Sequence, residues 1–99
     1  MTNKELRKMA MGFRSGLLGS RASNSMCYAV SAALEGFMSF CGIECRLTEG
    51  SVGDWIHFWI TLPDGRILDP TADQFPSKTG KIMPKVYLGK RPEHYVVNL

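Results

Sequence analysis

Three side chains that could together carry out nucleophilic catalysis occur in the order cysteine, histidine, aspartate, as Cys27, His57 and Asp69. A histidine can take the proton of a thiol and later return it to a leaving group. An aspartate can fix the tautomer of that histidine and stabilise its protonated form. Because the resulting thiolate attacks an acyl carbon, the three residues predict chemistry on an amide or peptide bond through a thioester, provided that the fold brings them together.

A predicted β-hairpin carries the histidine and the aspartate. Apolar and other side chains alternate over residues 55–62, which is typical of a β-strand. Pro63-Asp64-Gly65 follows, and this is a turn sequence in which the glycine accepts a left-handed conformation. The sequence therefore favours a three-residue hairpin loop with a bulge at the glycine.

The length of this loop decides whether the histidine and the aspartate can meet. With Leu62 opposite Arg66, His57 and Asp69 lie on one face of the hairpin as diagonal neighbours, about 7–8 Å apart at the backbone. A two-residue loop would shift the pairing by one residue and place them on opposite faces. A functional pair therefore requires the odd-length loop.

Two helices are expected before the hairpin. Thr2 and Glu5 have the spacing of a capping box, and residues 3–18 follow as an amphipathic helix. A second, more apolar helix begins near Ser25 and ends at Gly42. The expected inner faces contain Leu6, Met9, Phe13 and Leu17 in the first helix and Cys27, Val30, Leu34, Phe37, Met38 and Cys41 in the second.

The start of the second helix is the place where a cysteine can be activated. Asn24 or Ser25 is expected to cap this helix. Cys27 then lies in the first turn, where unpaired backbone N–H groups and the positive end of the helix dipole favour a thiolate. The backbone N–H of Cys27 can also hold a developing oxyanion.

Further strands complete the predicted fold. Residues 43–48 alternate as a short strand, and residues 49–53 have the composition of a turn. Residues 71–76 are expected to form an ordered loop and residues 77–85 an exposed polar stretch. Two edge strands are expected near the end of the chain, at Val86-Tyr87-Leu88 and at His94-Tyr95-Val96-Val97.

The segments around the three candidates resemble the catalytic core of transglutaminase-like cysteine proteins in the papain-like superfamily. In that family a helix-borne cysteine is followed by an H-x-W strand and a D-P-T strand. The matching segments here, within residues 23–75, are Asn24-Ser25-Met26-Cys27-Tyr28-Ala29-Val30, His57-Phe58-Trp59 and Leu68-Asp69-Pro70-Thr71.

The resemblance implies one transglutaminase-like domain over residues 1–99, with an α+β fold of N-terminal helices packed on a small antiparallel β-sheet. It implies Cys27 as nucleophile, His57 as base and Asp69 as orienting acid, with no cofactor and no metal. Family members hydrolyse amides or peptides, deamidate glutamine or transfer acyl groups to amines. The implied partner is therefore a peptide, protein or small amide substrate.

The residues that would bind this substrate flank the candidates. Asn24, Tyr28, Trp55 and Trp59 are the expected substrate-binding residues, the three aromatic ones as groove walls. Papain-like enzymes often take a second oxyanion donor from a glutamine or tryptophan upstream of the cysteine. This chain has neither there, so Asn24, Ser25 or a backbone amide must supply that donor.

Simpler interpretations stay open beside the catalytic one. Cys27 could be a core cysteine, and His57 a sheet histidine packed between two tryptophans. Asp69 could only form a turn before Pro70, and Asp73 is a rival for the acid role. The chain would then be a catalytically silent binding or inhibitor protein of the same fold.

Other cysteines and charges suggest further alternatives. Cys41 and Cys45 are read as core residues, with a regulatory disulfide or a metal-binding regulator as alternatives. His94 is expected at the surface. A run of basic residues without acidic ones between them is usually a solvated face, and otherwise a surface for an acidic protein partner or a phosphate. The residues of this run are Lys78, Lys81, Lys85, Lys90 and Arg91.

Composition limits the class of protein. The chain has 99 residues, enough for one domain, and 44% of them are hydrophobic, as in ordinary globular proteins. No apolar run approaches the ~18 residues of a membrane span, and the charged N-terminus leads into no secretory core, so we expect a cytoplasmic protein. An odd number of cysteines, 3, fits a reducing compartment. A net charge of +3 is too small to indicate nucleic-acid binding.

Overall fold

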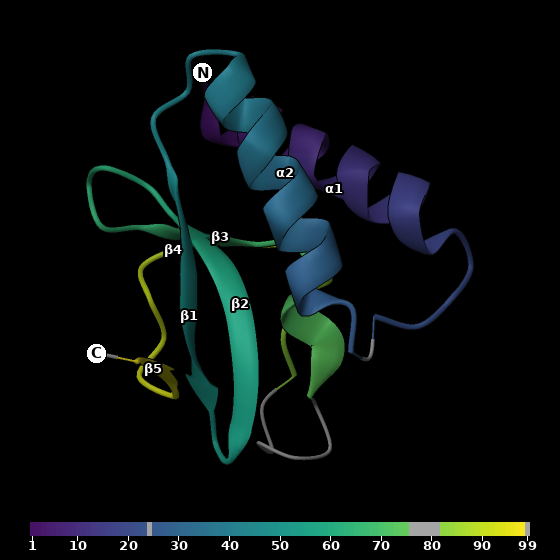
Figure 1. Cartoon of the computed structure of the whole chain (residues 1–99), viewed down its shortest axis with the longest axis vertical. Helices are drawn as coiled ribbons and strands as arrows, with labels where there is room; N and C mark the ends of the chain where they lie inside the picture. Colours follow the sequence, from purple (N-terminus) through teal and green to yellow (C-terminus); the bar gives the residue numbers. More distant parts are fainter. Residues whose placement is uncertain (24, 76–81, 99) are drawn as a thin grey trace.

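The computed structural model describes residues 1–23, 25–75 and 82–98, and it has an α+β architecture. Two N-terminal helices pack on a five-stranded antiparallel sheet that curls into a half-barrel (Figure 1). The elements are α1 (Asn3–Leu18), α2 (Cys27–Phe40), β1 (Arg46–Val52), β2 (Trp55–Thr61), β3 (Ile67–Asp69), the 3-10 turn η1 (Ala72–Gln74), β4 (Tyr87–Gly89) and β5 (Tyr95–Val97).

The order of the strands across the sheet is β4-β3-β2-β1-β5. The two short C-terminal strands, both predicted as edge strands, therefore lie at opposite edges of the sheet. The 3-10 turn lies in the predicted ordered loop, whereas the predicted polar stretch 77–85 falls largely outside the described residues.

The first helix begins as its sequence predicts. Thr2 accepts a hydrogen bond from the Glu5 backbone N–H, and the Glu5 carboxylate accepts one from the Thr2 N–H, which completes the capping box. The buried face differs from the predicted stripe. It consists of Leu6, Ala10, Arg14 and Leu18, while Met9 and Phe13 are only partly buried and Leu17 is exposed.

The second helix starts later than predicted. Its N-cap is Met26, which makes no side-chain cap, and Ser25 has a φ of 62° instead of capping. Asn24, the other predicted cap, lies outside the described residues. Val30, Leu34 and Met38 are buried as predicted, together with Ser31, whereas Phe37 and Cys41 are exposed.

The second helix ends at the predicted glycine. Gly42 has a φ of 77°, and its N–H donates to the Ser39 carbonyl, while the Ile43 N–H donates to the Met38 carbonyl. These two hydrogen bonds form a Schellman motif, which satisfies carbonyls of the last helical turn.

The first strand corrects the sequence prediction, because Arg46–Val52 is one strand and the turn before β2 is only Gly53 and Asp54. Residues 49–52 look like a turn by composition, yet Gly50 is paired with His57 inside the sheet. The indole of Trp59 lies in the space that a Cβ of Gly50 would occupy. A glycine therefore stands here because a large side chain packs onto the backbone.

The register of the next hairpin agrees with the prediction. Ile60 pairs with Leu68, and the Leu62 N–H donates to the Arg66 carbonyl at 2.9 Å, so the loop is Pro63-Asp64-Gly65. Gly65 has a φ of 89°, the left-handed conformation expected at a bulge. The odd-length loop is therefore present.

Both faces of the sheet bury apolar side chains. One cluster lies between the sheet and the helices and contains Leu6, Ala10, Leu34, Met38, Ile60, Leu62, Leu68, Val86 and Leu88. A second cluster fills the concave face and contains Val52, Trp59, Ile67 and Tyr95. The alternating side chains of β2 thus divide between two cores.

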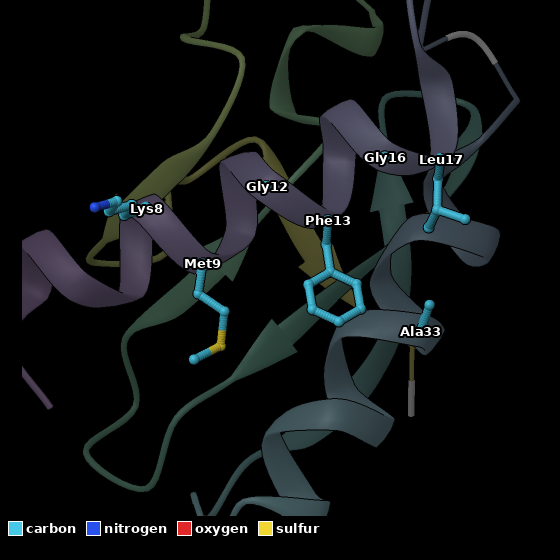
Figure 2. A pocket seen from close by; sticks show the side chains of 7 residues that line it. All are labelled: Lys8, Met9, Gly12, Phe13, Gly16, Leu17 and Ala33. Atoms are coloured by element: carbon cyan, nitrogen blue, oxygen red, sulfur yellow. The ribbon is translucent and has the colours of Figure 1, made fainter.

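An open apolar depression runs between the two helices (Figure 2). Phe13 of α1 packs on Phe37 of α2 with ring centroids 5.1 Å apart. Gly12 and Gly16 form part of the lining, and a Cβ added at either would meet no other atom within 4 Å. Helix α1 therefore carries two glycines that the described packing does not require.

Two glycine-to-alanine substitutions should have opposite effects on stability. Gly12→Ala should raise the free energy of unfolding by about 0.5–1 kcal/mol, because alanine costs less backbone entropy in a helix and fits here. Gly50→Ala should lower it by about 1–3 kcal/mol, because its Cβ overlaps the Trp59 indole and the Val96 carbonyl oxygen. Urea denaturation of both variants measures this, and equal midpoints would contradict the packing described at Gly50.

Among the described residues, no helix is long and apolar enough to cross a membrane.

Candidate active site

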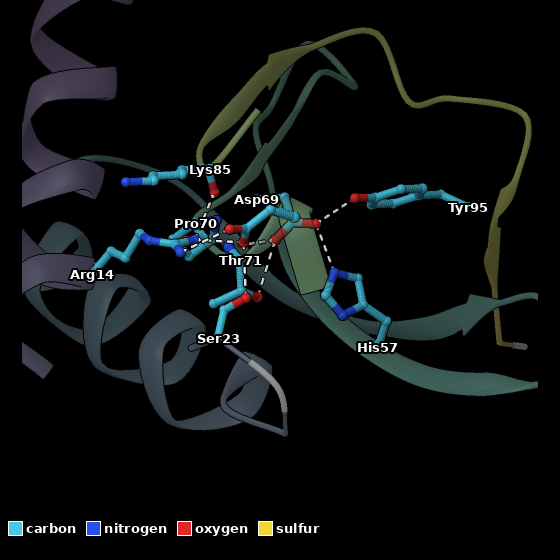
Figure 3. Close-up of polar contacts among 9 residues, drawn as sticks. Arg14, Ser23, His57, Asp69, Pro70, Thr71, Lys85 and Tyr95 are labelled. Carbon is cyan, nitrogen blue, oxygen red and sulfur yellow. Dashed lines mark hydrogen bonds and ion pairs between the residues drawn. The ribbon is translucent and has the colours of Figure 1, made fainter. Parts of the chain in front are cut away.

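His57 and Asp69 meet on the concave face of the sheet (Figure 3). The Nε2 atom of His57 lies 2.6 Å from Oδ2 of Asp69, and both side chains are buried. His57 comes from the middle of β2 and Asp69 from the end of β3, so the hairpin register places them on one face. The contact expected from the three-residue loop is therefore present.

Asp69 is held from several directions. Its Oδ2 also accepts a hydrogen bond from the Tyr95 hydroxyl at 2.5 Å, and its Oδ1 accepts the Thr71 backbone N–H at 2.9 Å and the Thr71 hydroxyl at 3.4 Å. Tyr95 comes from β5, at the far edge of the sheet. A buried carboxylate with this many donors is held in one orientation.

Tyr95 shows the electrostatic consequence of this arrangement. Burial first, and then the neighbouring Asp69 carboxylate, raise the pKa of the Tyr95 hydroxyl far above its usual value. The hydroxyl therefore remains protonated and acts as a permanent donor to Asp69.

The imidazole of His57 is protonated at neutral pH. Burial favours the neutral ring, but the hydrogen bond to Asp69, the interaction with the Cys27 thiol and the negative charges of both groups outweigh it and raise the pKa of His57 to about 9. The ring is enclosed by Trp59, Phe75 and Tyr95, with centroid distances of 6.0, 5.3 and 5.6 Å. These aromatic walls keep the ring in one orientation.

Cys27 is the first residue of α2, is 7% exposed, and interacts electrostatically with His57. Burial opposes ionisation, but the His57 imidazole and the backbone N–H groups of Phe58 and Tyr28 lower the pKa of the Cys27 thiol below its ordinary value. Because Asp69 occupies Nε2, the other ring nitrogen, Nδ1, is the atom left for the sulfur. The arrangement therefore favours a thiolate beside an imidazolium.

The contact between the sulfur and the ring is loose. Within the described part of the chain, no group meets the geometry of a formed hydrogen bond at Nδ1 of His57. Hydrogen bonds of this kind are often long until substrate binds. The shifted pKa values of Cys27 and His57 nevertheless indicate that the two side chains interact.

Two backbone N–H groups interact with the sulfur of Cys27. Cys27 begins α2, and Met26 provides no side-chain cap, so no N-cap side chain occupies the first-turn N–H groups. The Tyr28 N–H from the helix and the Phe58 N–H from β2 both interact with the thiol. These donors could stabilise an oxyanion, whereas Ser25 is exposed and Asn24 lies outside the described residues.

A second polar cluster fixes the segment that follows Asp69. The Arg14 guanidinium binds Asp73 through two hydrogen bonds of 2.7 and 2.9 Å and also donates to the carbonyls of Pro70 and Lys85 (Figure 3). Ser23 donates to the same carboxylate at 2.8 Å. Burial is outweighed by these partners, which lower the pKa of Asp73. Asp73 is thus committed to Arg14, and Asp69 is the carboxylate that binds the imidazole.

The aromatic residues expected to bind substrate take different positions. Tyr28 is exposed and packs edge-on against Phe58 with centroids 5.0 Å apart, and Trp55 is exposed and stacks on Phe75. Trp59 is 0% exposed and belongs to the concave core. The expectation of Trp59 as a groove wall is wrong, because its indole fills the space above Gly50.

The remaining candidates lie away from this site. Cys41 and Cys45 are free thiols, and burial first, with Glu35 nearby, raises the pKa of Cys45. No group of three or more potential metal ligands occurs among the described residues. In the predicted basic run, Lys85, Lys90 and Arg91 are exposed, while Lys78 and Lys81 lie outside the described residues.

Sequence reasoning missed two residues of the site. Arg14 follows Leu6 and Ala10 at four-residue spacing, which could have placed it on the inner face of α1. Tyr95 offered no such signal, because its position depends on the pairing of β5 with β1, where it lies opposite Val52.

Comparison with known proteins adds no assignment: no protein-family model, no curated protein and no solved structure matches this chain.

Proposed function

We propose that this chain is a transglutaminase-like cysteine hydrolase or acyltransferase with a papain-like core, acting on an amide or peptide bond. Cys27 is the nucleophile, His57 the general base and acid, and Asp69 the residue that orients the imidazole. The order of these residues along the chain and the H-x-W and D-P-T segments support this family assignment.

The reaction follows from the positions of the groups. The Cys27 thiolate attacks the carbonyl carbon, and the N–H groups at the start of α2 stabilise the oxyanion. The C–N bond then breaks as the His57 imidazolium gives its proton to the leaving amine. The neutral imidazole next takes a proton from water or an amine, whose attack breaks the thioester and restores the thiolate.

One observation carries the proposal: a buried carboxylate binds Nε2 of the imidazole, and a thiol with a lowered pKa lies beside the same ring. A core cysteine would have its pKa raised by burial, as that of Cys45 is. A thiolate–imidazolium pair is useful for nucleophilic chemistry, whereas in a purely structural core the desolvation of its two charges would cost stability.

The pH dependence of alkylation tests the proposal. Iodoacetamide labelling over roughly pH 5 to 9, with each cysteine quantified by peptide mass spectrometry, should show Cys27 reacting well below the ~8.5 pKa of a free thiol. Cys41 is exposed and serves as a reference within the same molecule. Cys45 should react last, because its pKa is raised.

Labelling of Cys27 that follows Cys41 at every pH would contradict the proposal. The chain would then be better described as a binding protein of the same fold, in which Cys27→Ala leaves partner binding unchanged.

A further inference from the structure

We propose that an exposed apolar strip beside Cys27 binds a large apolar group next to the reacting carbonyl of the substrate. The strip consists of Tyr28, Phe58 and Ile56. This inference rests on the proposed function and specifies its substrate class: amides with an aromatic or branched aliphatic side chain at the bond that is attacked.

The sheet register places these side chains on one face. Phe58 and Ile56 alternate with His57 along β2, so they point to the face opposite the imidazole. Ile56 pairs with Ser51 of β1, and Ser51 pairs with Val96 of β5. Directly paired residues share a face, so the polar Ser51 lies beside Ile56 on this face and separates it from Val96.

The helices leave this part of the sheet uncovered. Helix α2 begins at Cys27 and packs Leu34 and Met38 over Ile60, and the first part of β2 extends past the start of this helix (Figure 1). Tyr28 is 58% exposed and Ile56 64%, whereas Phe58 is partly buried. Exposed apolar side chains gathered in one place commonly mark a binding surface.

The strip begins beside Cys27. The backbone N–H groups of Tyr28 and Phe58 both interact with the Cys27 thiol, and the two rings pack edge-on at 5.0 Å. A carbonyl positioned for attack on Cys27 therefore has its neighbouring substituent at these rings. This continuity with the thiol identifies the occupant as substrate and not as an unrelated partner.

A polar border limits the strip on its β1 side. Glu49 is opposite Phe58, and its carboxylate accepts a hydrogen bond from Asn98 at 3.1 Å. Ser51 donates to the side-chain carbonyl of Asn98 at 3.1 Å. An acidic substituent would meet the Glu49 carboxylate, so the surface selects for uncharged apolar groups.

Affinity labelling tests this inference. Cys27 should react about tenfold faster with N-(2-phenylethyl)iodoacetamide than with iodoacetamide, because binding to the strip removes the apolar phenyl ring from water. The rate should also saturate with the aromatic reagent. Cys41 in the same molecule should show no such preference, since it lies beyond the other end of α2.

Single substitutions identify the surface. Ile56→Ser and Tyr28→Ala should each reduce the preference of Cys27 for the aromatic reagent severalfold, and both alter exposed positions, where folding is tolerant. Phe40→Ser is the matched control: it removes a 90% exposed aromatic ring about 20 Å along α2 from Cys27 and should leave the preference unchanged.

The outcomes separate the two proposals. This inference would be overturned, and the proposed function left standing, if Cys27 reacted at low pH without preferring the aromatic reagent. The same holds if Ile56→Ser and Tyr28→Ala both kept that preference unchanged. Because the preference can be measured at any pH at which Cys27 reacts, an ordinary pH profile would instead overturn the proposed function. A preference lost only in Phe40→Ser would also overturn the inference.

Discussion

Asp69→Ala should lower the free energy of unfolding by about 3–5 kcal/mol, the largest stability effect we expect at this site. The substitution removes the acceptor of His57 Nε2, of the Tyr95 hydroxyl and of the Thr71 backbone N–H, all of them buried. It leaves a buried imidazolium without its counter-charge and a buried hydroxyl without its acceptor. Urea denaturation near neutral pH measures the change.

Asp64→Ala is the matched control. Asp64 lies in the exposed hairpin loop and pairs with Arg66, so its removal should leave the urea midpoint close to that of the wild type. If Asp69→Ala unfolded at the same urea concentration as Asp64→Ala, the buried network around His57 would not stabilise the fold.

His57→Gln should reduce the alkylation rate of Cys27 at about pH 6.5 by at least about tenfold. Because the pKa of His57 is raised from its ordinary value of about 6.5 to about 9, the ring is an imidazolium at pH 6.5 and loses its charge only as the pH rises through 9. Without it, burial is the main influence left on Cys27, and burial raises the pKa of a thiol. Rates from peptide mass spectrometry measure this change.

The same sample contains a control for this experiment. Cys41 is exposed and should react at an unchanged rate in His57→Gln. At strongly alkaline pH the variant and the wild type should converge, because both thiols are then ionised. A Cys27 rate at pH 6.5 that is unaffected by the substitution would mean that His57 does not activate this thiol.

Signals carried by a few neighbouring residues predicted their part of the fold well. The capping box of Thr2 and Glu5 starts α1, and Gly42 ends α2. Pro63-Asp64-Gly65 determines the loop length, and the loop length determines the register that brings His57 to Asp69. In each case the deciding interactions lie within a few residues of the signal.

Features that depend on distant contacts could not be predicted in this way. The composition around Gly50 predicts a turn, but β1 continues through this residue because the Trp59 indole packs directly onto its backbone. Arg14 is of a residue type usually found at the surface, but its guanidinium makes four hydrogen bonds, to the Asp73 carboxylate and to two backbone carbonyls. Tyr95 reaches Asp69 only because β5 pairs with β1.

The place of Tyr95 on the last strand has a consequence for biosynthesis. A nascent chain that has emerged only as far as β4 already contains thiol, imidazole and carboxylate, yet its Asp69 still lacks the phenol donor. The complete set of donors to Asp69 therefore forms only after β5 has paired with β1 at the other edge of the sheet.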